Sequence, residues 1–506
     1  MNQIRMGAIL SYISIFLTFA VGLIYTPILI RLLGQTDYGL YSLILAIASY
    51  LSLLDLGVGN AIVRYIARNR SIGDSKKESD LIGQFLIFFS IIGFLTMVLG
   101  MIIYMMVPDI FKNSIDTSDI NTAQIMVLVL SLNFALSFPL NVYSAVLQAY
   151  EKFIFLRLSS IVRILLVPIL TLFTLQVGGH LITMTVITSL VNISILVIGY
   201  IYAKRYIGIR VTFSPIEKNF KKEIFSYAFL IFLTSIADKI YWQTDQVLLG
   251  IMENSNIVAI YAVAIQFIMI FMSLSTAISS LFLPKISQIV TEKNHTTQVN
   301  DLFLKISRVQ FFIIALAFSG FILFGREFII LWAGKSFETA YAIVVILMIP
   351  FFFDLIQNTG IVILQARGLY MFRTISLLAC SLLNIIVSIP VINYYGSIGT
   401  AIVTAFFVAL GNVLLLNFYY HIKIGLNMKL YWLSITKSLI PIIVLIFITY
   451  IIRFKFEFAT SLIVAISTYL VFYTLIVYIF CLNLHERNSL RNIKIRLKES
   501  KWRKRY

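Results

Sequence analysis

Long apolar runs alternate with short polar segments along almost the whole chain. Fourteen of these runs are close to or above the roughly 20 residues that a helix needs to cross the hydrocarbon core of a bilayer. They lie at residues 8–30, 39–62, 81–107, 123–147, 158–177, 181–203, 224–249, 257–283, 309–330, 341–365, 374–393, 397–420, 438–452 and 458–482. The polar connections leave no room for a separate soluble domain. The pattern predicts an all-α integral membrane protein with about 14 transmembrane helices.

The first six runs and the next six are related by an internal duplication. A shift of 216 residues matches Ile15–Thr18 with Ile231–Thr234 and Leu32–Gly34 with Leu248–Gly250. A shift of 217 also keeps polar residues and glycines in register, matching Asn141, Gln148, Gly179 and Gly208 with Asn358, Gln365, Gly396 and Gly425. Apolar helices match Leu with Leu by chance, but chance does not align Asn, Gln and Gly.

The duplication predicts the domain organisation and a transport function. We expect an N-terminal lobe at 1–210, a C-terminal lobe at 211–425, two appended spans at 426–482 and a basic cytoplasmic tail at 483–506. Because six is even, both repeats start on the same side of the membrane and share one topology. Parallel repeats of this kind form two bundles that enclose a central cleft and open it alternately to either face.

Composition and charge agree with this interpretation and add an orientation. The chain is 60% hydrophobic and 12% charged, with a mean hydropathy of +0.95, far outside the range of soluble domains. With the N-terminus inside, most of the 40 Lys and Arg residues fall in inner connections and the tail. Cytoplasmic loops accumulate these residues, so both termini are expected in the cytoplasm. The outer connections carry only Arg31, Lys112, Arg326, Lys335, Arg453 and Lys455.

The net charge of +18 raises nucleic acid as a partner, but the basic residues flank membrane spans. Anionic lipids of the inner leaflet are therefore the expected partner, and no nucleic acid is expected. Leu490, Ile493 and Leu497 follow helical spacing in the tail, which predicts an amphipathic helix on that leaflet. The two cysteines, Cys380 and Cys481, both lie in apolar spans, so we expect no disulfide framework and no metal site.

Polar residues recur on one face of two spans that the duplication pairs. The fourth span carries Asn133, Ser137, Asn141, Ser144 and Gln148, at intervals that place them on one helical face. The tenth span carries Asp354, Gln357, Asn358 and Gln365. We interpret the two stripes as opposite walls of one hydrated cavity, since polar groups avoid hydrocarbon. The alternative is hydrogen bonding between packed helices.

Ionisable residues inside or beside spans are the candidates for chemistry. The candidates for binding phosphate are the cations Arg31, Arg163 and Lys239. The candidates for coupling with H⁺ or Na⁺ are the carboxylates Asp55, Asp238, Asp245 and Asp354. Snorkelling toward headgroups is the alternative for the two arginines, and a structural ion pair is the alternative for Asp238 and Asp245. Asp55 lies too far from Arg64 for direct pairing, so we expect its partner on another helix or in water.

Several motifs resemble the polysaccharide transporters, the Wzx-type flippases of the multidrug/oligosaccharidyl-lipid/polysaccharide exporter superfamily. These motifs are Arg31–Gly34, Asp37–Tyr41, Asp55–Ala61, Gln148–Lys152 and Asp245–Gly250. The resemblance covers essentially the whole chain. It implies a flippase in the bacterial plasma membrane that moves an undecaprenyl-pyrophosphate-linked oligosaccharide from the inner to the outer leaflet.

Residue roles within this function are our inference, because no motif specifies the sugars. Arg31, Arg163 and Lys239 are expected to neutralise phosphate. Asn141, Gln148, Asn358 and Gln365 are expected to hydrogen-bond sugar hydroxyls. No catalytic residue and no cofactor are expected beyond a coupling H⁺ or Na⁺. Other polysaccharide-assembly proteins are further candidate partners.

Three other functions compete with this one. A multidrug exporter of the same superfamily would use similar acidic residues to bind cationic drugs. A membrane polymerase or glycosyltransferase would act on the same lipid, although such enzymes usually need a sizeable outer loop and none is visible here. A scaffold of an assembly complex would tolerate substitution of every residue named above.

Overall fold

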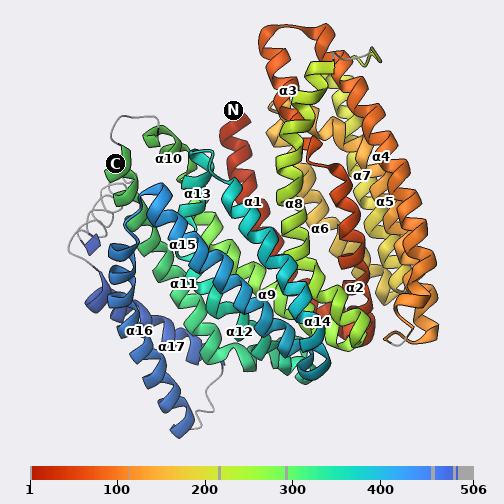
Figure 1. Ribbon diagram of the computed structural model, residues 1–506. Helices are drawn as coiled ribbons and strands as arrows, with labels where there is room; N and C mark the ends of the chain where they lie inside the picture. The colour runs from red at the N-terminus through yellow and green to blue at the C-terminus, as the bar shows by residue number, and fades with distance from the viewer. Residues whose placement is uncertain are drawn as a thin grey trace, which may run out of the picture. The chain divides into compact units, whose positions relative to one another are not determined.

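The chain is helical throughout the part that the computed structural model describes (Figure 1), which is residues 3–112, 114–214, 218–290, 295–456, 462–482 and 486–487. The α-helices are α1 (Gln3–Leu33), α2 (Gln35–Leu51), α3 (Val58–Ile72), α4 (Ser75–Ile110), α5 (Thr117–Ala149), α6 (Phe153–Gln176), α7 (Leu181–Tyr202), α8 (Lys218–Met252), α9 (Ser255–Ser280), α10 (Leu283–Val290), α11 (His295–Ala333), α12 (Glu338–Leu355), α13 (Thr359–Ala366), α14 (Met371–Val408), α15 (Leu416–Tyr419), α16 (Met428–Phe456) and α17 (Leu462–Ile476). Short 3₁₀ or π segments are η1 (Ser52–Asp55), η2 (Ala203–Ile207), η3 (Lys335–Phe337), η4 (Ala409–Leu415), η5 (Tyr420–Ile424) and η6 (Val477–Cys481).

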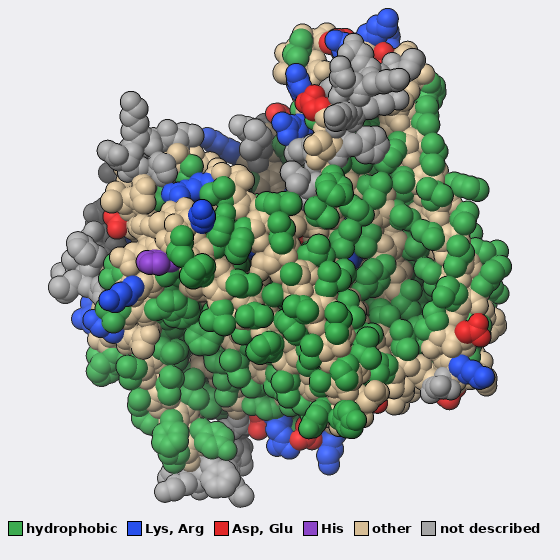
Figure 2. All heavy atoms as spheres, viewed as in Figure 1, with side chains coloured by type: hydrophobic (Ala, Val, Ile, Leu, Met, Phe, Trp, Pro, Cys, Tyr) green, Lys and Arg blue, Asp and Glu red, His purple; other side chains and the backbone are tan. Residues whose placement is uncertain are grey.

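The predicted all-α membrane fold is confirmed. Within the described chain, 12 helical segments are long and apolar enough to cross a bilayer. The predicted seventh run corresponds to α8, which is not among the 12, and the predicted eleventh and twelfth runs share α14, which kinks at Gly396 (φ 55°, ψ −141°). The count of 14 spans therefore stays a prediction. Hydrophobic side chains cover most of the face drawn in Figure 2, as expected of a surface that meets lipid.

The chain divides into two compact units. Unit 1 comprises Met1–Ala264 and Thr374–Thr404, and unit 2 comprises Ile265–Arg373 and Ala405–Tyr506. In unit 1, α5 lies beside both α4 and α7, and α1 packs on α6 (Figure 1). In unit 2, α11 contacts α12, α16 and α17. The lobe boundaries predicted from the repeat stay a prediction, and the predicted helix of the tail falls outside the described residues.

Two turns recur at positions that the 217-residue shift pairs. After α5, the left-handed Glu151 (φ 57°) donates its N–H to the carbonyl of Gln148 at 3.0 Å. After α13, the left-handed Gly368 (φ 69°) donates its N–H to the carbonyl of Gln365 at 3.1 Å. The π segments η2 and η5 likewise both end on a left-handed glycine, Gly208 and Gly425. Each unit thus builds the same local geometry at these matched positions.

The second predicted run is broken in the middle by two left-handed residues. Leu56 (φ 50°) and Gly57 (φ 71°) separate η1 from α3. A Cβ atom at Gly57 would lie 2.6 Å from the carbonyl oxygen of Ala228 on α8, so glycine is required here both by φ and by the close approach of α8. This break places the first turn of α3 inside the segment Gln35–Ile72, which is long and apolar enough to cross a bilayer.

An even closer helix contact occurs at Gly39 of α2. A Cβ atom there would lie 1.7 Å from the carbonyl oxygen of Ser255 at the start of α9. Gly39→Ala should therefore lower the stability of the protein by about 1–3 kcal/mol, because backbone must move to admit the methyl group. Thermal unfolding of the purified protein in detergent measures the effect.

The matched control is Gly320→Ala on α11, where nothing lies within 4 Å of the added Cβ. This control should be neutral or stabilising by up to about 1 kcal/mol, because Ala has the higher helix propensity. Equal unfolding temperatures for the two variants would contradict the close contact.

Candidate functional site

Unit 1 contains a polar cavity of about 580 Å³ between η1, α3, α5, α6 and α7, which we call the polar basin. Polar side chains supply much of its lining: Ser52, Asp55, Asn60, Ser137, Asn141, Ser144, Gln148, Arg157, Ser159, Ser160 and Arg163. Phe134, Phe138 and Phe153 add aromatic surface. Small-molecule sites typically combine apolar and aromatic walls with a few polar groups that orient the ligand. The basin combines the same two kinds of wall but has more polar groups. In a membrane span, such a lining requires water or a polar ligand.

The polar stripe of α5 forms one wall of this basin. Ser137, Asn141, Ser144 and Gln148 all line it, and the side chains of Asn141 and Gln148 are exposed. Asn133, the first residue of the predicted stripe, instead accepts a hydrogen bond at 3.0 Å from Asn192 Nδ2 on α7. The structure thus brings most of the predicted stripe to a cavity, as expected for a hydrated wall.

Two arginines of α6 face the basin. Arg163 Nη1 donates to Asn192 Oδ1 at 3.1 Å, and Asn192 Nδ2 in turn donates to Ser137 Oγ at 3.0 Å. This chain of bonds orients the guanidinium. Arg157 was not predicted, because it precedes the apolar run at 158–177 and counts as a loop residue in the sequence. Among the described residues, neither Arg157 nor Arg163 is within 4.0 Å of a carboxylate oxygen.

Asp55 lies against the helix that follows it. Both of its carboxylate oxygens lie 3.3 Å from the position that a Cβ atom at Gly59 would take in the first turn of α3, where free N–H groups and the helix dipole favour negative charge. The sequence does not show that Leu56 and Gly57 break the span and bring the first turn of α3 beside this carboxylate. The expected partner of Asp55 on another helix or in water stays a prediction, and Asp55 lines the basin.

A second polar cluster in unit 1 surrounds Asp245, and we call it the Asp245 cluster. Asp245 Oδ2 accepts hydrogen bonds from Tyr261 Oη at 2.6 Å and from Thr404 Oγ1 at 2.7 Å. Thr404 Oγ1 accepts from Asn384 Nδ2 at 2.9 Å, and Ser388 Oγ donates to Asn384 Oδ1 at 2.7 Å. All five residues are buried. They come from α8, α9 and α14, and only Asp245 was predicted.

In unit 2, the stripe of the predicted tenth span is packed against protein. Asp354 Oδ2 accepts from Asn412 Nδ2 at 3.1 Å, and Gln357 Nε2 donates to the carbonyl of Asn412 at 3.0 Å. Asn358 Nδ2 donates to Ser279 Oγ at 3.1 Å. All these side chains are buried, which favours the alternative of hydrogen bonding between packed helices. Gln365, at the end of α13, is exposed.

Three further predicted residues lie away from the polar basin. Arg31 is an exposed residue in the last turn of α1. Lys239 on α8 is half-buried and interacts electrostatically with its neighbour Asp238, whose side chain is exposed. None of the three lines the basin. Their predicted roles toward phosphate and coupling ions stay predictions.

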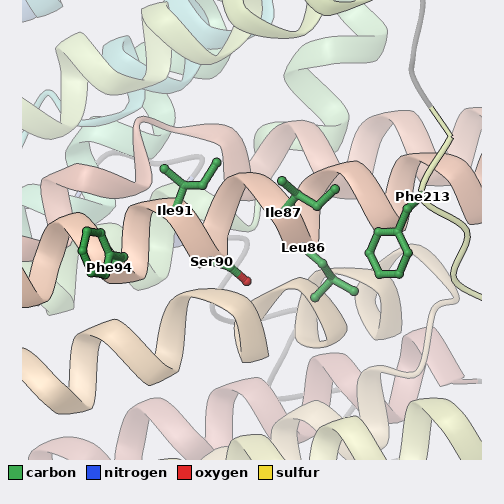
Figure 3. Close-up of a pocket in the computed structure, with 6 residues that line it drawn as sticks. All are labelled: Leu86, Ile87, Ser90, Ile91, Phe94 and Phe213. Atoms are coloured by element: carbon green, nitrogen blue, oxygen red, sulfur yellow. The ribbon is translucent and has the colours of Figure 1, made fainter.

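A second cavity of unit 1 offers no comparable chemistry. It has a volume of about 590 Å³ and lies on the flank of α4, where Figure 3 shows Leu86, Ile87 and Phe94 along the helix and Phe213 closing one end. Ser90 is its single polar lining residue. Among the described residues, no three His, Cys, Asp or Glu side chains are grouped so that they could hold a metal ion. The polar basin and the Asp245 cluster are therefore the candidate sites.

Comparison with known proteins agrees with a membrane transporter fold. The family described as polysaccharide biosynthesis protein matches residues 4–290, more than half of the chain. The chain belongs to this family. One protein of similar sequence is a candidate O-antigen transporter of Shigella flexneri. It is 24% identical over 352 residues, and the match covers 67% of this chain and 79% of that protein.

Another relative is a candidate flippase of low-salt glycan biosynthesis, Agl15 of Haloferax volcanii. It is 26% identical over 203 residues, and the match spans 40% of this chain and 42% of the length of that relative. Neither relative is named as an enzyme.

Solved structures share the fold of this polysaccharide biosynthesis family member. The lipid II flippase MurJ, in an inward closed conformation, has a TM-score of 0.73 at 19% identity and covers 93% of this chain and 98% of its own. An inward-facing multidrug resistance transporter of the MATE family has a TM-score of 0.64 at 16% identity. The match covers 78% of this chain and 92% of that transporter. The chain therefore has the fold of these two transporters, and the protein is a multi-pass membrane protein.

The Asp245 cluster predicts an effect on stability. Thr404→Val keeps the shape of the side chain but removes one hydrogen bond from Asp245 and one from Asn384. Because both groups are buried, we expect a loss of about 1–3 kcal/mol. Thermal unfolding in detergent is the measurement.

Thr468→Val is the matched control, because Thr468 is exposed and donates only to the carbonyl of Val464 in its own helix. It should change stability by less than about 0.5 kcal/mol. If Thr404→Val unfolded at the same temperature as this control, the cluster would carry no buried hydrogen-bond network.

Proposed function

We propose that the protein is a flippase that moves an undecaprenyl-pyrophosphate-linked oligosaccharide from the cytoplasmic to the outer leaflet by alternating access. Unaided transfer of a pyrophosphate and several hydroxylated sugars through hydrocarbon would cost on the order of tens of kcal/mol. The polyprenyl tail is already soluble in lipid. A protein that shelters only the head group therefore removes most of the barrier. The two named relatives, a candidate O-antigen transporter and a candidate glycan flippase, support this proposal.

The observation that carries the proposal is the polar basin. Arg157 and Arg163 place two guanidinium groups on α6, a helix long and apolar enough to cross a membrane. A cation within a membrane span is costly unless it faces water or an anion. A diphosphate supplies the compensating charge and matches the planar donor fork of arginine. Asn141 and Gln148 then provide amides for sugar hydroxyls, and the serines of the lining provide further donors and acceptors.

Coupling to an ion gradient is the second part of the proposal. The Asp245 cluster joins one carboxylate with hydroxyl and amide groups on three helices. A buried carboxylate without a cationic neighbour is costly, and binding H⁺ or Na⁺ removes that cost. Hydroxyl, amide and carboxylate oxygens are suited to hard cations. Binding and release of H⁺ or Na⁺ at this cluster would shift the population of the conformation in which unit 1 releases the transported lipid.

The main alternative, a multidrug exporter, is disfavoured by the charge of the basin. Cationic drugs need a site with an excess of carboxylates. The basin instead has two arginines and one aspartate, Asp55, which lies against the first turn of α3. An anionic substrate fits this balance better. A drug-resistance profile on overexpression separates the two functions.

Removing the positive charge of the basin should stop transport. We expect Arg157→Ala combined with Arg163→Ala to lower the flipping rate by about tenfold or more, which corresponds to the loss of about 1.4 kcal/mol or more of binding free energy. The assay uses proteoliposomes with a fluorescent lipid-linked oligosaccharide and follows its exposure to a membrane-impermeant quencher. Arg163→Lys should keep part of the rate, because the charge remains while the donor fork is lost.

Arg326→Ala is the control for this experiment. Arg326 is an exposed arginine paired with Glu338 on unit 2, with its side chain 55% exposed, and its removal should leave the rate unchanged. Flipping that survives the double substitution in normally folded protein would exclude the basin as the head-group site.

Asp245→Asn should uncouple transport from the ion gradient, because the amide takes up no proton and lacks the negative charge that draws a cation into the cluster. Wild-type flipping should slow when both proton and sodium gradients are collapsed, whereas the residual flipping of the variant should not respond. Transport by the wild type that persists undiminished without either gradient would exclude ion coupling, and this outcome would leave the head-group site intact.

A further inference from the structure

Unit 2 contains a buried arginine whose hydrogen bonds are all made within the protein. Arg308 of α11 donates from Nε and Nη2 to the two carboxylate oxygens of Glu486 at 2.7 and 2.9 Å. Its Nη1 donates to Ser434 Oγ at 2.9 Å, and its Nη2 also donates to the carbonyl of Cys481 at 2.8 Å. The guanidinium therefore joins α11, α16 and the start of the tail. Its Nη1 also donates to Ser438 Oγ at 3.4 Å, so all five N–H groups of the side chain are used.

Beside this arginine lies an apolar groove of about 970 Å³ between α11 and the last helix, which we call the α11–α17 groove. Its walls are mostly aliphatic and aromatic: Leu304, Val309, Phe312, Ile313 and Leu316 of α11, and Tyr473, Thr474, Val477, Tyr478 and Leu482 of α17 and the residues after it. Val309, Ile313 and Tyr478 are between 40% and 54% exposed. The groove is thus open along its side, where the bilayer meets the protein.

The length of the groove matches one leaflet of the membrane. It follows α11 from Leu304 to Leu316, which at 1.5 Å per residue is about 18 Å. Half of a hydrocarbon core of about 30 Å is about 15 Å. The groove therefore fits a chain that spans a single leaflet, and it is short for a polyprenyl chain.

The polar groups lie at one end of the groove and carry a net positive charge. Lys305, Arg308 and Glu486 line that end. The charges of Arg308 and Glu486 cancel in their ion pair, so the exposed Lys305 is left as the excess cation. Arg487 lies next to this end, with its guanidinium 5.7 Å from the ring centre of Tyr478. An apolar slot of one-leaflet length with a basic end has the pattern of an anionic phospholipid.

We propose that the α11–α17 groove binds one anionic phospholipid, with an acyl chain along Val309 and Ile313 and the phosphate at Lys305. Because the predicted cytoplasmic end of α11 carries Lys305, the lipid belongs to the inner leaflet. Its head group lies beside Glu486. The lipid and Arg308 together therefore fix the point at which the C-terminal segment of the protein leaves the membrane. This lipid is a resident of the protein and is separate from the transported substrate.

Native mass spectrometry of the purified full-length chain tests the site directly. The probes are phosphatidylglycerol and phosphatidylcholine with identical acyl chains, added to delipidated protein. We expect the first phosphatidylglycerol to bind about fivefold or more tighter than phosphatidylcholine, since electrostatic attraction to a basic residue at the membrane surface is worth about 1 kcal/mol. Equal binding of the two lipids would overturn the proposal.

Two variants locate the binding. Lys305→Ala should abolish the preference for phosphatidylglycerol, whereas Lys335→Ala on η3, outside the groove, should keep it. Ile313→Trp should fill the groove and weaken both lipids. Thermal unfolding shows that each variant is folded, which is expected because Lys305 and Ile313 are exposed. A preference that survives both Lys305→Ala and Ile313→Trp would place the lipid elsewhere and overturn the site.

Competition decides between a resident lipid and the substrate. Undecaprenyl phosphate added in excess should leave the bound phosphatidylglycerol in place. Its displacement, one for one, would show that the groove serves the transported lipid and would overturn the proposal. The measurement needs no transport, so its result is independent of whether the basin carries out flipping.

Discussion

The structure depends on one constraint, which is that a polar group within hydrocarbon must bond to protein or face water. Unit 2 meets much of the constraint by pairing: Asp354 bonds to Asn412, Asn358 bonds to Ser279 and Arg308 bonds to Glu486. Among the described residues, Asp354 Oδ1 and Gln357 Oε1 remain buried there without a hydrogen-bond partner. Unit 1 meets it in the same way at Asp245 but not at the polar basin, where Arg157, Asn141 and Gln148 are left facing open volume. That difference separates groups that hold the fold together from groups that are available to a ligand.

The same constraint relates the two candidate sites of unit 1. The polar basin has excess positive charge and is open, which suits the anionic head group of a lipid-linked saccharide. The Asp245 cluster has negative charge and is closed, which suits a small cation. Both are built by helices of one compact unit, and α2 and α3 each contact both α5 of the basin and α8 of the Asp245 cluster, so the two sites share neighbouring helices. Coupling between them requires only that the cation and the cargo prefer different conformations of the unit.

Much of the fold follows from the sequence, because apolar length and helical period report directly on membrane helices. The α5 stripe was found by its spacing alone, and the turns at Glu151 and Gly368 show that the repeat is kept in the backbone. Arg157 was missed because the apolar run at 158–177 begins one residue after it. The partners of Asp245 were missed because Thr404 lies 159 residues away in sequence. Spacing also could not show that the stripe of the tenth span is packed against protein while the stripe of α5 lines a cavity, since both have the same pattern.

Cysteine accessibility tests the central claim, that the polar basin is a wet chamber for an anionic head group. In a chain with Cys380 and Cys481 replaced, Ser160→Cys in the basin should react with a water-soluble maleimide in intact membranes, and a pyrophosphate-linked oligosaccharide should protect it. Asn358→Cys, in the packed stripe of unit 2, should remain unreactive. An unreactive Ser160→Cys, or one that the lipid-linked sugar does not protect, would contradict the account.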